Sequence, residues 1–119
     1  MTQDNHSMFV LSLGGSLVVP NGGIDTEYLK RFNEFIRNQI SSKQRRFFVV
    51  VGGGGTTRHY QDAARTVVGD SVISEDLDWI GIHTTRINAH LLRTIFRDIA
   101  HPKVIEHYDE KTEVSEPLV

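Results

Sequence analysis

Two glycine-rich loops are the residues of this chain best suited to chemistry. The first covers residues 14–16 (Gly-Gly-Ser) after the apolar run 9–13, and the second covers residues 52–55 (four glycines) directly after the apolar run 47–51. Glycine has no Cβ, so the backbone of such a loop can approach a ligand closely. Where a loop leads into a helix, free N–H groups and the positive helix end favour a phosphate. Two such loops in one short chain indicate two anionic groups brought together, as a phosphotransferase requires.

The elements around the first loop follow a strand–helix–strand order. The apolar runs 8–13 and 47–51 predict two strands. Between them, apolar residues recur at helical spacing and predict a helix that is capped by Asp25 or Thr26 and ends near residue 42. We expect residues 14–23, which contain a Pro-Asn-Gly-Gly turn signal, to form a loop.

Two further helices are expected around the second loop. The sequence predicts one helix over 56–68, an acidic and turn-rich connection over 69–78, and a second helix over about 79–99. Residues 103–105 read as a weak third strand, and Leu118-Val119 could begin another. This order predicts an α/β fold: a parallel sheet with helices on both faces, in three α/β/α layers. Three strands make a small sheet, so the chain looks like the truncated front part of a larger domain.

The composition of the chain excludes some classes of function and gives no support to others. The chain has 119 residues, a net charge of −2 and no cysteine, which gives no support to nucleic-acid binding and excludes disulfides and cysteine nucleophiles. No apolar run approaches the roughly 18 residues of a membrane span. Residues 1–7 are polar and lack the features of a signal peptide, so we expect a disordered tail on a soluble cytoplasmic protein. The six histidines lack the i, i+4 spacing of a helical zinc site, so no metal site is expected.

Three segments together resemble the amino acid kinase family, and most closely its uridylate kinase branch of archaeal type. They are residues 13–20, residues 49–54 with Arg58, and residues 78–82 with 85–89. The glycine loops alone indicate only the broad family, whereas the third segment points to the uridylate kinase branch. Order and spacing agree over about residues 8–105.

The resemblance implies a reaction and an incomplete catalytic unit. Members of this branch transfer the γ-phosphoryl group of ATP, with Mg²⁺, to UMP. They are about twice as long as this chain, so residues 8–119 would be the phosphate-acceptor part of the domain, and the ATP-binding half would be absent. The resemblance also implies a homo-oligomer, a dimer or a hexamer. Many family members carry a lysine where this chain has Ser12, a departure that archaeal uridylate kinases share.

The resemblance further assigns roles to residues of the matching segments. Those expected at the ATP phosphates are Gly14, Gly15, Ser16, Gly54 and Arg58, and Arg58 is also the expected catalytic residue. A guanidinium beside the glycine loop offers a fork of donors to phosphate oxygens. The helical line of Arg86, Arg93 and Arg97 is interpreted instead as a solvated or oligomer-forming face.

The residues that the resemblance assigns to the acceptor UMP are Gly53, Asp78, Gly81 and Thr85. An ionised carboxylate only accepts hydrogen bonds, so Asp78 is suited to two ribose hydroxyls. Asp78 could alternatively cap the helix expected from residue 79. Gly81 would leave room for the sugar or base.

Two other functions stay open at this stage. One is a different small-acceptor kinase of the same family, such as an isopentenyl phosphate or amino acid kinase, for which a ribose-reading Asp78 has no purpose. The other is a non-catalytic fragment that binds a nucleotide or forms oligomers.

Overall fold

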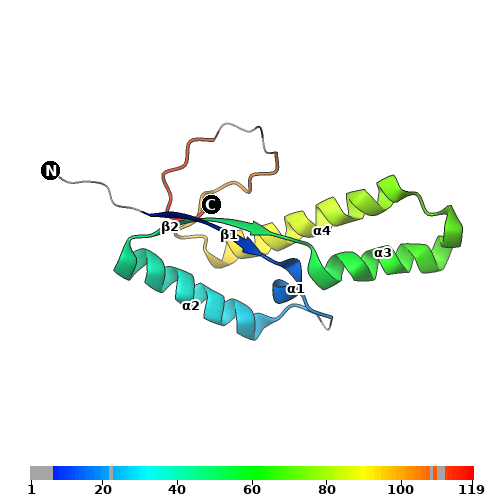
Figure 1. The fold of residues 1–119 in the computed structure, drawn as a ribbon, viewed down its shortest axis with the longest axis horizontal. Helices are drawn as coiled ribbons and strands as arrows, with labels where there is room; N and C mark the ends of the chain where they lie inside the picture. The colour runs from blue at the N-terminus through cyan, green and yellow to red at the C-terminus, as the bar shows by residue number, and fades with distance from the viewer. Residues whose placement is uncertain (1–6, 22, 108, 110–111) are drawn as a thin grey trace.

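The computed structural model describes residues 7–21, 23–107, 109 and 112–119. In chain order, its elements are β1 (Met8–Leu13), α1 (Gly15–Val18), α2 (Thr26–Lys43), β2 (Arg46–Val51), α3 (Gly54–Val68), a 3₁₀ turn (Gly69–Ser71) and α4 (Ser74–Ile95). In Figure 1, α3 and α4 form a long hairpin that extends beyond the carboxyl ends of the two strands. The tail expected over residues 1–7 lies, except for Ser7, outside the described residues.

The two strands form a parallel pair. Their register runs from Met8 opposite Arg46 to Leu13 opposite Val51, so both glycine loops leave the same end of the sheet. The expected parallel α/β fold is therefore confirmed.

The far end of the chain also joins this sheet. Leu118 forms parallel bridges with Phe47 and Ala100, and the N–H of Val119 donates to the carbonyl oxygen of Phe47 at 2.9 Å. Leu118-Val119, which could have begun a further strand, thus forms isolated bridges to the sheet rather than a strand. The expectation of a strand over residues 103–105 is wrong, because these three described residues form no strand. At Phe47 the edge of β2 pairs instead with Leu118.

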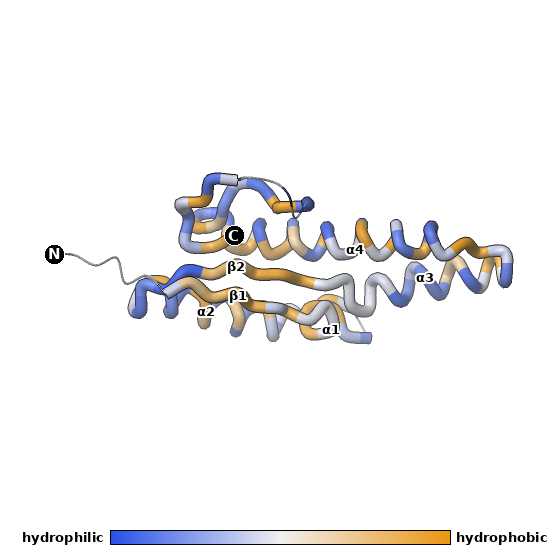
Figure 2. Tube along the Cα trace, turned by 45° about the horizontal axis from the view of Figure 1, so that its top comes forward, coloured by the Kyte–Doolittle hydropathy of each residue, from blue (hydrophilic) through white to orange (hydrophobic). Residues whose placement is uncertain are grey.

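The core lies on one face of the strands. Leu11, Leu13 and Val49 share that face because side chains alternate along a strand, and they pack against α2 and the end of α4. Ile36 of α2 and Phe96 after α4 are completely buried there. On the other face, Val10 is 70% and Val50 58% exposed, so the described residues build two of the three expected layers. Figure 2 shows that both strands are mostly hydrophobic.

Helix α2 begins and ends as its sequence predicts. The Asp25 carboxylate accepts from the N–H of Tyr28 at 2.9 Å and caps the helix, which confirms one of the two expected caps. Gln44 ends it in the left-handed conformation, with φ of 52°.

The boundaries of the other helices differ from expectation. The loop over 14–23 contains the short helix α1, and α3 begins at Gly54 rather than at residue 56. Helix α4 begins at Ser74 and ends at Ile95, not at 79 and 99. Of the connection expected over 69–78, residues 69–73 lie before α4, and residues 74–78 form its beginning. Glu75 and Asp76 there interact favourably with the positive end of the helix.

Candidate functional site

The two glycine loops are packed directly against each other. A Cβ added to Gly15 would lie only 2.3 Å from the backbone nitrogen of Gly54. The N–H of Gly55 donates to the carbonyl oxygen of Val19 at 2.7 Å. Gly54 also has a φ of 60°, a conformation that side chains rarely adopt. Backbone of the neighbouring loop, rather than free space for a ligand, therefore explains why Gly15 and Gly54 are glycines.

Helix α4 holds the second loop through a buried amide. The side-chain nitrogen of Asn88 donates to the carbonyl oxygens of Gly52 at 2.9 Å and Gly53 at 3.1 Å. The hydroxyls of Thr57 and Thr84 hydrogen bond to each other beside Gly53. The sequence placed Asn88 in a segment that resembles the family, but it predicted none of these contacts of Thr57, Thr84 and Asn88.

The spacing of polar residues along α4 is the sequence signal that could have indicated Thr84 and Asn88. The buried residues of this helix are Thr84, Asn88 and Leu92, spaced four apart, which places them on one face. Ile87 of the same helix is 62% exposed, so it does not share this buried face. Two buried polar side chains in register on one helix require partners, and the backbone of the second loop and Thr57 supply them.

Arg58 joins the second loop to the first. It lies in the second turn of α3, and its guanidinium nitrogens reach Ser16 Oγ and Asn21 Oδ1, each at 3.3 Å. Both contacts are long for hydrogen bonds and are exposed to solvent. This position leaves the guanidinium available to a ligand at the junction of the loops. Gly14, by contrast, is exposed and has no atom within 4 Å of an added Cβ.

A cavity of about 1180 Å³ opens beside the second loop. The expected site residues that line it are Gly53, Gly54, Arg58, Asp78, Gly81 and Thr85. The first-loop residues Gly14, Gly15 and Ser16 do not line it, and they reach it only through their contacts with Gly54 and Arg58. The structure therefore brings the expected acceptor residues together in one cavity, with the first loop at its edge.

Helix α4 presents Asp78 and Thr85 to this cavity from one side. They are seven residues apart, which is two helical turns, and Asp78 is exposed. Ile73 is the N-cap of α4, so the interpretation of Asp78 as a helix cap is wrong. Gly81 lies inside the helix, and a Cβ there would meet the Thr57 methyl group at 3.8 Å, so its missing side chain faces α3.

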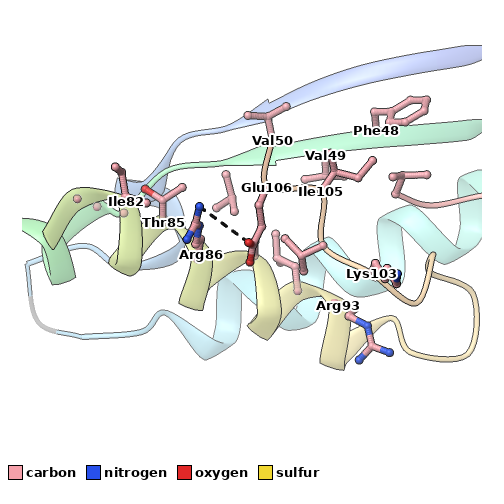
Figure 3. A pocket seen from close by; sticks show the side chains of 18 of the residues that line it. Phe48, Val49, Val50, Ile82, Thr85, Arg86, Arg93, Lys103, Ile105 and Glu106 are labelled. Atoms are coloured by element: carbon pink, nitrogen blue, oxygen red, sulfur yellow. Dashed lines mark ion pairs between the residues drawn. The ribbon is translucent and has the colours of Figure 1, made fainter. Parts of the chain in front are cut away.

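The remaining wall of the cavity carries several cations. Arg86, Arg93 and Lys103 line it, and the interpretation of Arg86, Arg93 and Arg97 as a solvated or oligomer-forming face stays a prediction. Figure 3 shows Arg86 of α4 directed toward Glu106, with 3.9 Å between Nη2 and Oε2. Together with Arg58, the lining cations outnumber the acidic side chains Asp78 and Glu106, which favours an anionic ligand.

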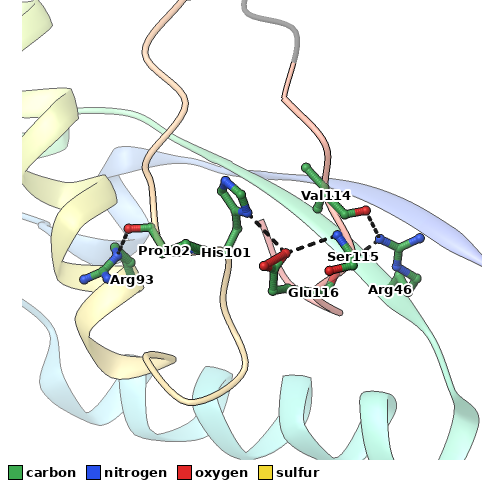
Figure 4. Close-up of polar contacts among 7 residues, drawn as sticks. All are labelled: Arg46, Arg93, His101, Pro102, Val114, Ser115 and Glu116. Carbon is green, nitrogen blue, oxygen red and sulfur yellow. Dashed lines mark hydrogen bonds and ion pairs between the residues drawn. The ribbon is translucent and has the colours of Figure 1, made fainter.

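Hydrogen bonds hold the C-terminal segment, residues 114–119, at the far end of the cavity (Figure 4). Arg46 Nη2 donates to the carbonyl oxygens of Val114 and Glu116, both at 3.2 Å. Nδ1 of His101 lies 3.1 Å from a Glu116 carboxylate oxygen, and this hydrogen bond holds the pKa of Glu116 below its usual value. These contacts fix the segment that pairs Leu118 with β2.

Two kinds of feature are absent from the described part of the chain. Its His, Asp and Glu side chains form no group of three or more that could hold a metal ion. None of its helices combines the length and the apolar character that crossing a membrane requires.

Comparison with known proteins places this geometry in a family. A sequence model of the amino acid kinase family matches residues 7–111. The uridylate kinase of Methanosarcina barkeri is 37% identical over 110 residues, covering 92% of this chain and 44% of that protein. The uridylate kinase of Methanocorpusculum labreanum is 41% identical over 101 residues, covering 85% of this chain and 40% of that protein.

A solved structure agrees with these sequence matches. The crystal structure of uridylate kinase from Archaeoglobus fulgidus matches with a TM-score of 0.63 and 37% identity, over 83% of this chain and 41% of that one. The chain thus spans a little over two fifths of the lengths of such relatives. Because the family model covers most of its residues, the chain belongs to the amino acid kinase family.

Proposed function

We propose that this chain is the phosphate-acceptor part of a uridylate kinase, an enzyme that transfers the γ-phosphoryl group of ATP to UMP. The observation that carries the proposal is the cavity in which Asp78 and Thr85 of α4 face the second glycine loop. The uridylate kinases among the relatives support the choice of acceptor. On this proposal, residues 8–119 supply the acceptor site, and the ATP-binding half belongs to the part of the relatives that the match does not cover.

The proposed site has an acceptor side on α4 and a phosphate side at the two glycine loops. Asp78, two helical turns from Thr85, would accept hydrogen bonds from the ribose hydroxyls of UMP. The UMP phosphate would then lie toward Gly53 at the start of α3, where N–H groups and the helix dipole favour negative charge. Arg58 reaches from this side to Ser16 of the first loop, where we place the ATP phosphates together with Gly14, Gly15 and Gly54.

Phosphoryl transfer of this kind depends on positioning and charge neutralisation rather than on a covalent nucleophile. Arg58 is the proposed catalytic residue, because its guanidinium lies between the two loops and would neutralise charge on the transferred group. The cations on the cavity wall would add to the attraction for both nucleotides.

Magnesium is implied by the family, but the side chains of this chain do not fit a protein-held Mg²⁺ site. The carboxylates on the cavity wall, Asp78 and Glu106, come from different elements, and Glu106 pairs with Arg86. The first loop offers backbone groups and one hydroxyl, not the carboxylates that Mg²⁺ prefers. We therefore assign no Mg²⁺ ligand here and derive no step through the ion.

The proposal is tested on a fused chain, in which this chain replaces the part of the Methanosarcina barkeri enzyme that it matches. ADP release in a coupled assay should depend on UMP as the acceptor. Phosphorylation of isopentenyl phosphate or an amino acid in place of UMP would select the other small-acceptor kinases. Binding of UMP without any transfer would select a non-catalytic nucleotide-binding fragment.

Location, pathway and assembly are further parts of the proposal. A uridylate kinase of this type would act in pyrimidine nucleotide biosynthesis in the cytoplasm, with UMP and ATP as its partners. Exposed apolar side chains on α3 and α4, among them Val67 at 82% and Trp79 at 48%, support a homo-oligomer. Sedimentation equilibrium of the fused chain would show a dimer or a hexamer if this is correct, and a monomer if it is not.

A further inference from the structure

Asn88 is the most deeply buried polar side chain in contact with the second glycine loop. It is 3% exposed, and a buried primary amide is stable only when its donors are satisfied. Its nitrogen donates to two successive carbonyl oxygens, those of Gly52 at 2.9 Å and Gly53 at 3.1 Å. Both contacts join α4 to backbone 35 or more residues away in sequence. The side chain thus fixes the loop rather than its own helix.

These two bonds also determine where the next two N–H groups point. The described chain contains no cis peptide bond, and in a planar trans peptide the C=O and the following N–H point in opposite directions. Turning the Gly52 carbonyl toward Asn88 therefore turns the N–H of Gly53 away from α4. The Gly53 carbonyl does the same for the N–H of Gly54. The N–H of Gly55 is already used, because it donates to Val19.

A neighbouring hydroxyl pair on the same face of α4 also contacts this turn. Thr84 lies one helical turn before Asn88, and its hydroxyl contacts that of Thr57 on α3 beside Gly53. Thr84 also bonds back to the carbonyl oxygen of Ile80 at 2.9 Å, which anchors the pair to α4. The loop is thereby held against α4 at both its carbonyl groups and its following helix.

We propose that Asn88 is a positioning residue for phosphoryl transfer: it orients the N–H groups of Gly53 and Gly54 toward the anionic ligand groups at the junction of the two loops. This inference rests on the proposed function, since it deepens the role of the same site. Asn88 does not touch the ligand and acts only through the loop. Its removal should therefore loosen the two N–H groups and weaken phosphate binding while the sheet stays intact.

The test uses the ¹⁵N-labelled 119-residue chain and three variants. Asn88→Leu keeps a similar volume and removes both donors. Asn88→Asp keeps the shape and removes the donors when ionised, and it replaces Asn88→Leu if that variant does not fold. Asn38→Leu is the matched control, because Asn38 lies on α2, away from both glycine loops.

Two measurements are made on each variant. The first is the backbone order of the Gly53 and Gly54 amides in the free protein, from heteronuclear NOE and hydrogen exchange. The second is a titration with UMP that follows the same amides. For the Asn88 variants we expect lower order at both glycines, unchanged resonances along β1 and β2, and a dissociation constant for UMP raised roughly 10-fold. The Asn38 variant should match the wild type in both.

The two measurements separate this inference from the function on which it rests. A folded Asn88 variant whose Gly53 and Gly54 amides are as ordered as in the wild type would overturn the positioning role, whatever the titration shows. If the wild type itself does not bind UMP, the acceptor assignment fails, and the order of the free loop still decides what Asn88 does. Loss of order together with unchanged UMP affinity would also refute the inference.

Discussion

Replacing Gly15 by alanine should destabilise the chain far more than the same change at its neighbour Gly14. At Gly15, the new Cβ would lie 2.3 Å from Gly54 N and 2.6 Å from the carbonyl carbon of Gly52, against about 3.5–4.0 Å for an ordinary carbon contact. Because the obstacle is backbone, the loops must separate by about 1 Å. Overpacking of this kind costs roughly 1–3 kcal/mol, and weakening the Gly55 to Val19 hydrogen bond adds about 1 kcal/mol.

The matched control at Gly14 follows from the same geometry. An added Cβ there meets nothing within 4 Å, and its φ of −54° and ψ of 134° suit any residue. Urea unfolding followed by circular dichroism should show Gly15→Ala lowering the free energy of unfolding by on the order of 2–4 kcal/mol. Gly14→Ala should stay within about 0.5 kcal/mol of the wild type. Equal stabilities for the two variants would refute the packing of one loop on the other.

Three other expectations follow. Arg58→Ala in the fused chain should lower kcat/KM by a barrier change on the order of 2–4 kcal/mol, with a smaller effect on UMP affinity; an unchanged kcat/KM would remove Arg58 from the site. The isolated 119-residue chain should not phosphorylate UMP in a coupled ADP-release assay, and turnover near 1 s⁻¹, at the low end of usual enzyme rates of roughly 1–10³ s⁻¹, would contradict the fragment argument. The hydrogen bond from Arg37 lowers the pKa of Asp98 to about 2, below the value in the unfolded chain. The ion pair between Asp98 and Arg37 therefore stabilises the fold at neutral pH, and this stabilisation is lost as the pH falls from about 4 through 2. Acid titrations of the wild type and Asp98→Asn should therefore diverge less below that range than above it, and parallel curves would contradict the pairing.

The strands, the two glycine loops and α2 could be predicted from the sequence because each carries a local signal. Runs of β-branched and aromatic residues mark the strands, and a carboxylate at Asp25 marks the start of α2. The start of α4 was missed for the opposite reason. Ser74 to Asp78 contain no apolar periodicity, and the helix gains its stability from packing of later residues such as Leu92.

The positions that determine the site geometry depend on contacts across long stretches of chain. The bonds from Asn88 to the second loop span 35 and 36 residues, and the pair of Thr57 and Thr84 spans 27. The spacing of Thr84 and Asn88 marks a polar stripe on one face of α4, but it does not show that the second loop lies against this face. The same holds for the edge of β2 beside Phe47, which pairs with Leu118 from much later in the chain.

The central claim is that the carboxylate of Asp78 accepts hydrogen bonds from the ribose hydroxyls of UMP. The most direct test is a calorimetric titration of UMP into the fused chain and into its Asp78→Asn variant. Asparagine keeps the size and one acceptor oxygen but loses the charge and the second acceptor. A hydrogen bond to a charged group contributes about 1.5–3 kcal/mol, so the dissociation constant for UMP should rise roughly 10- to 100-fold, while that for ATP stays nearly unchanged. Asp76→Asn serves as the control, because Asp76 is an exposed acidic residue in the first turn of α4 that does not line the cavity. Equal UMP affinity in the wild type and Asp78→Asn would contradict the account.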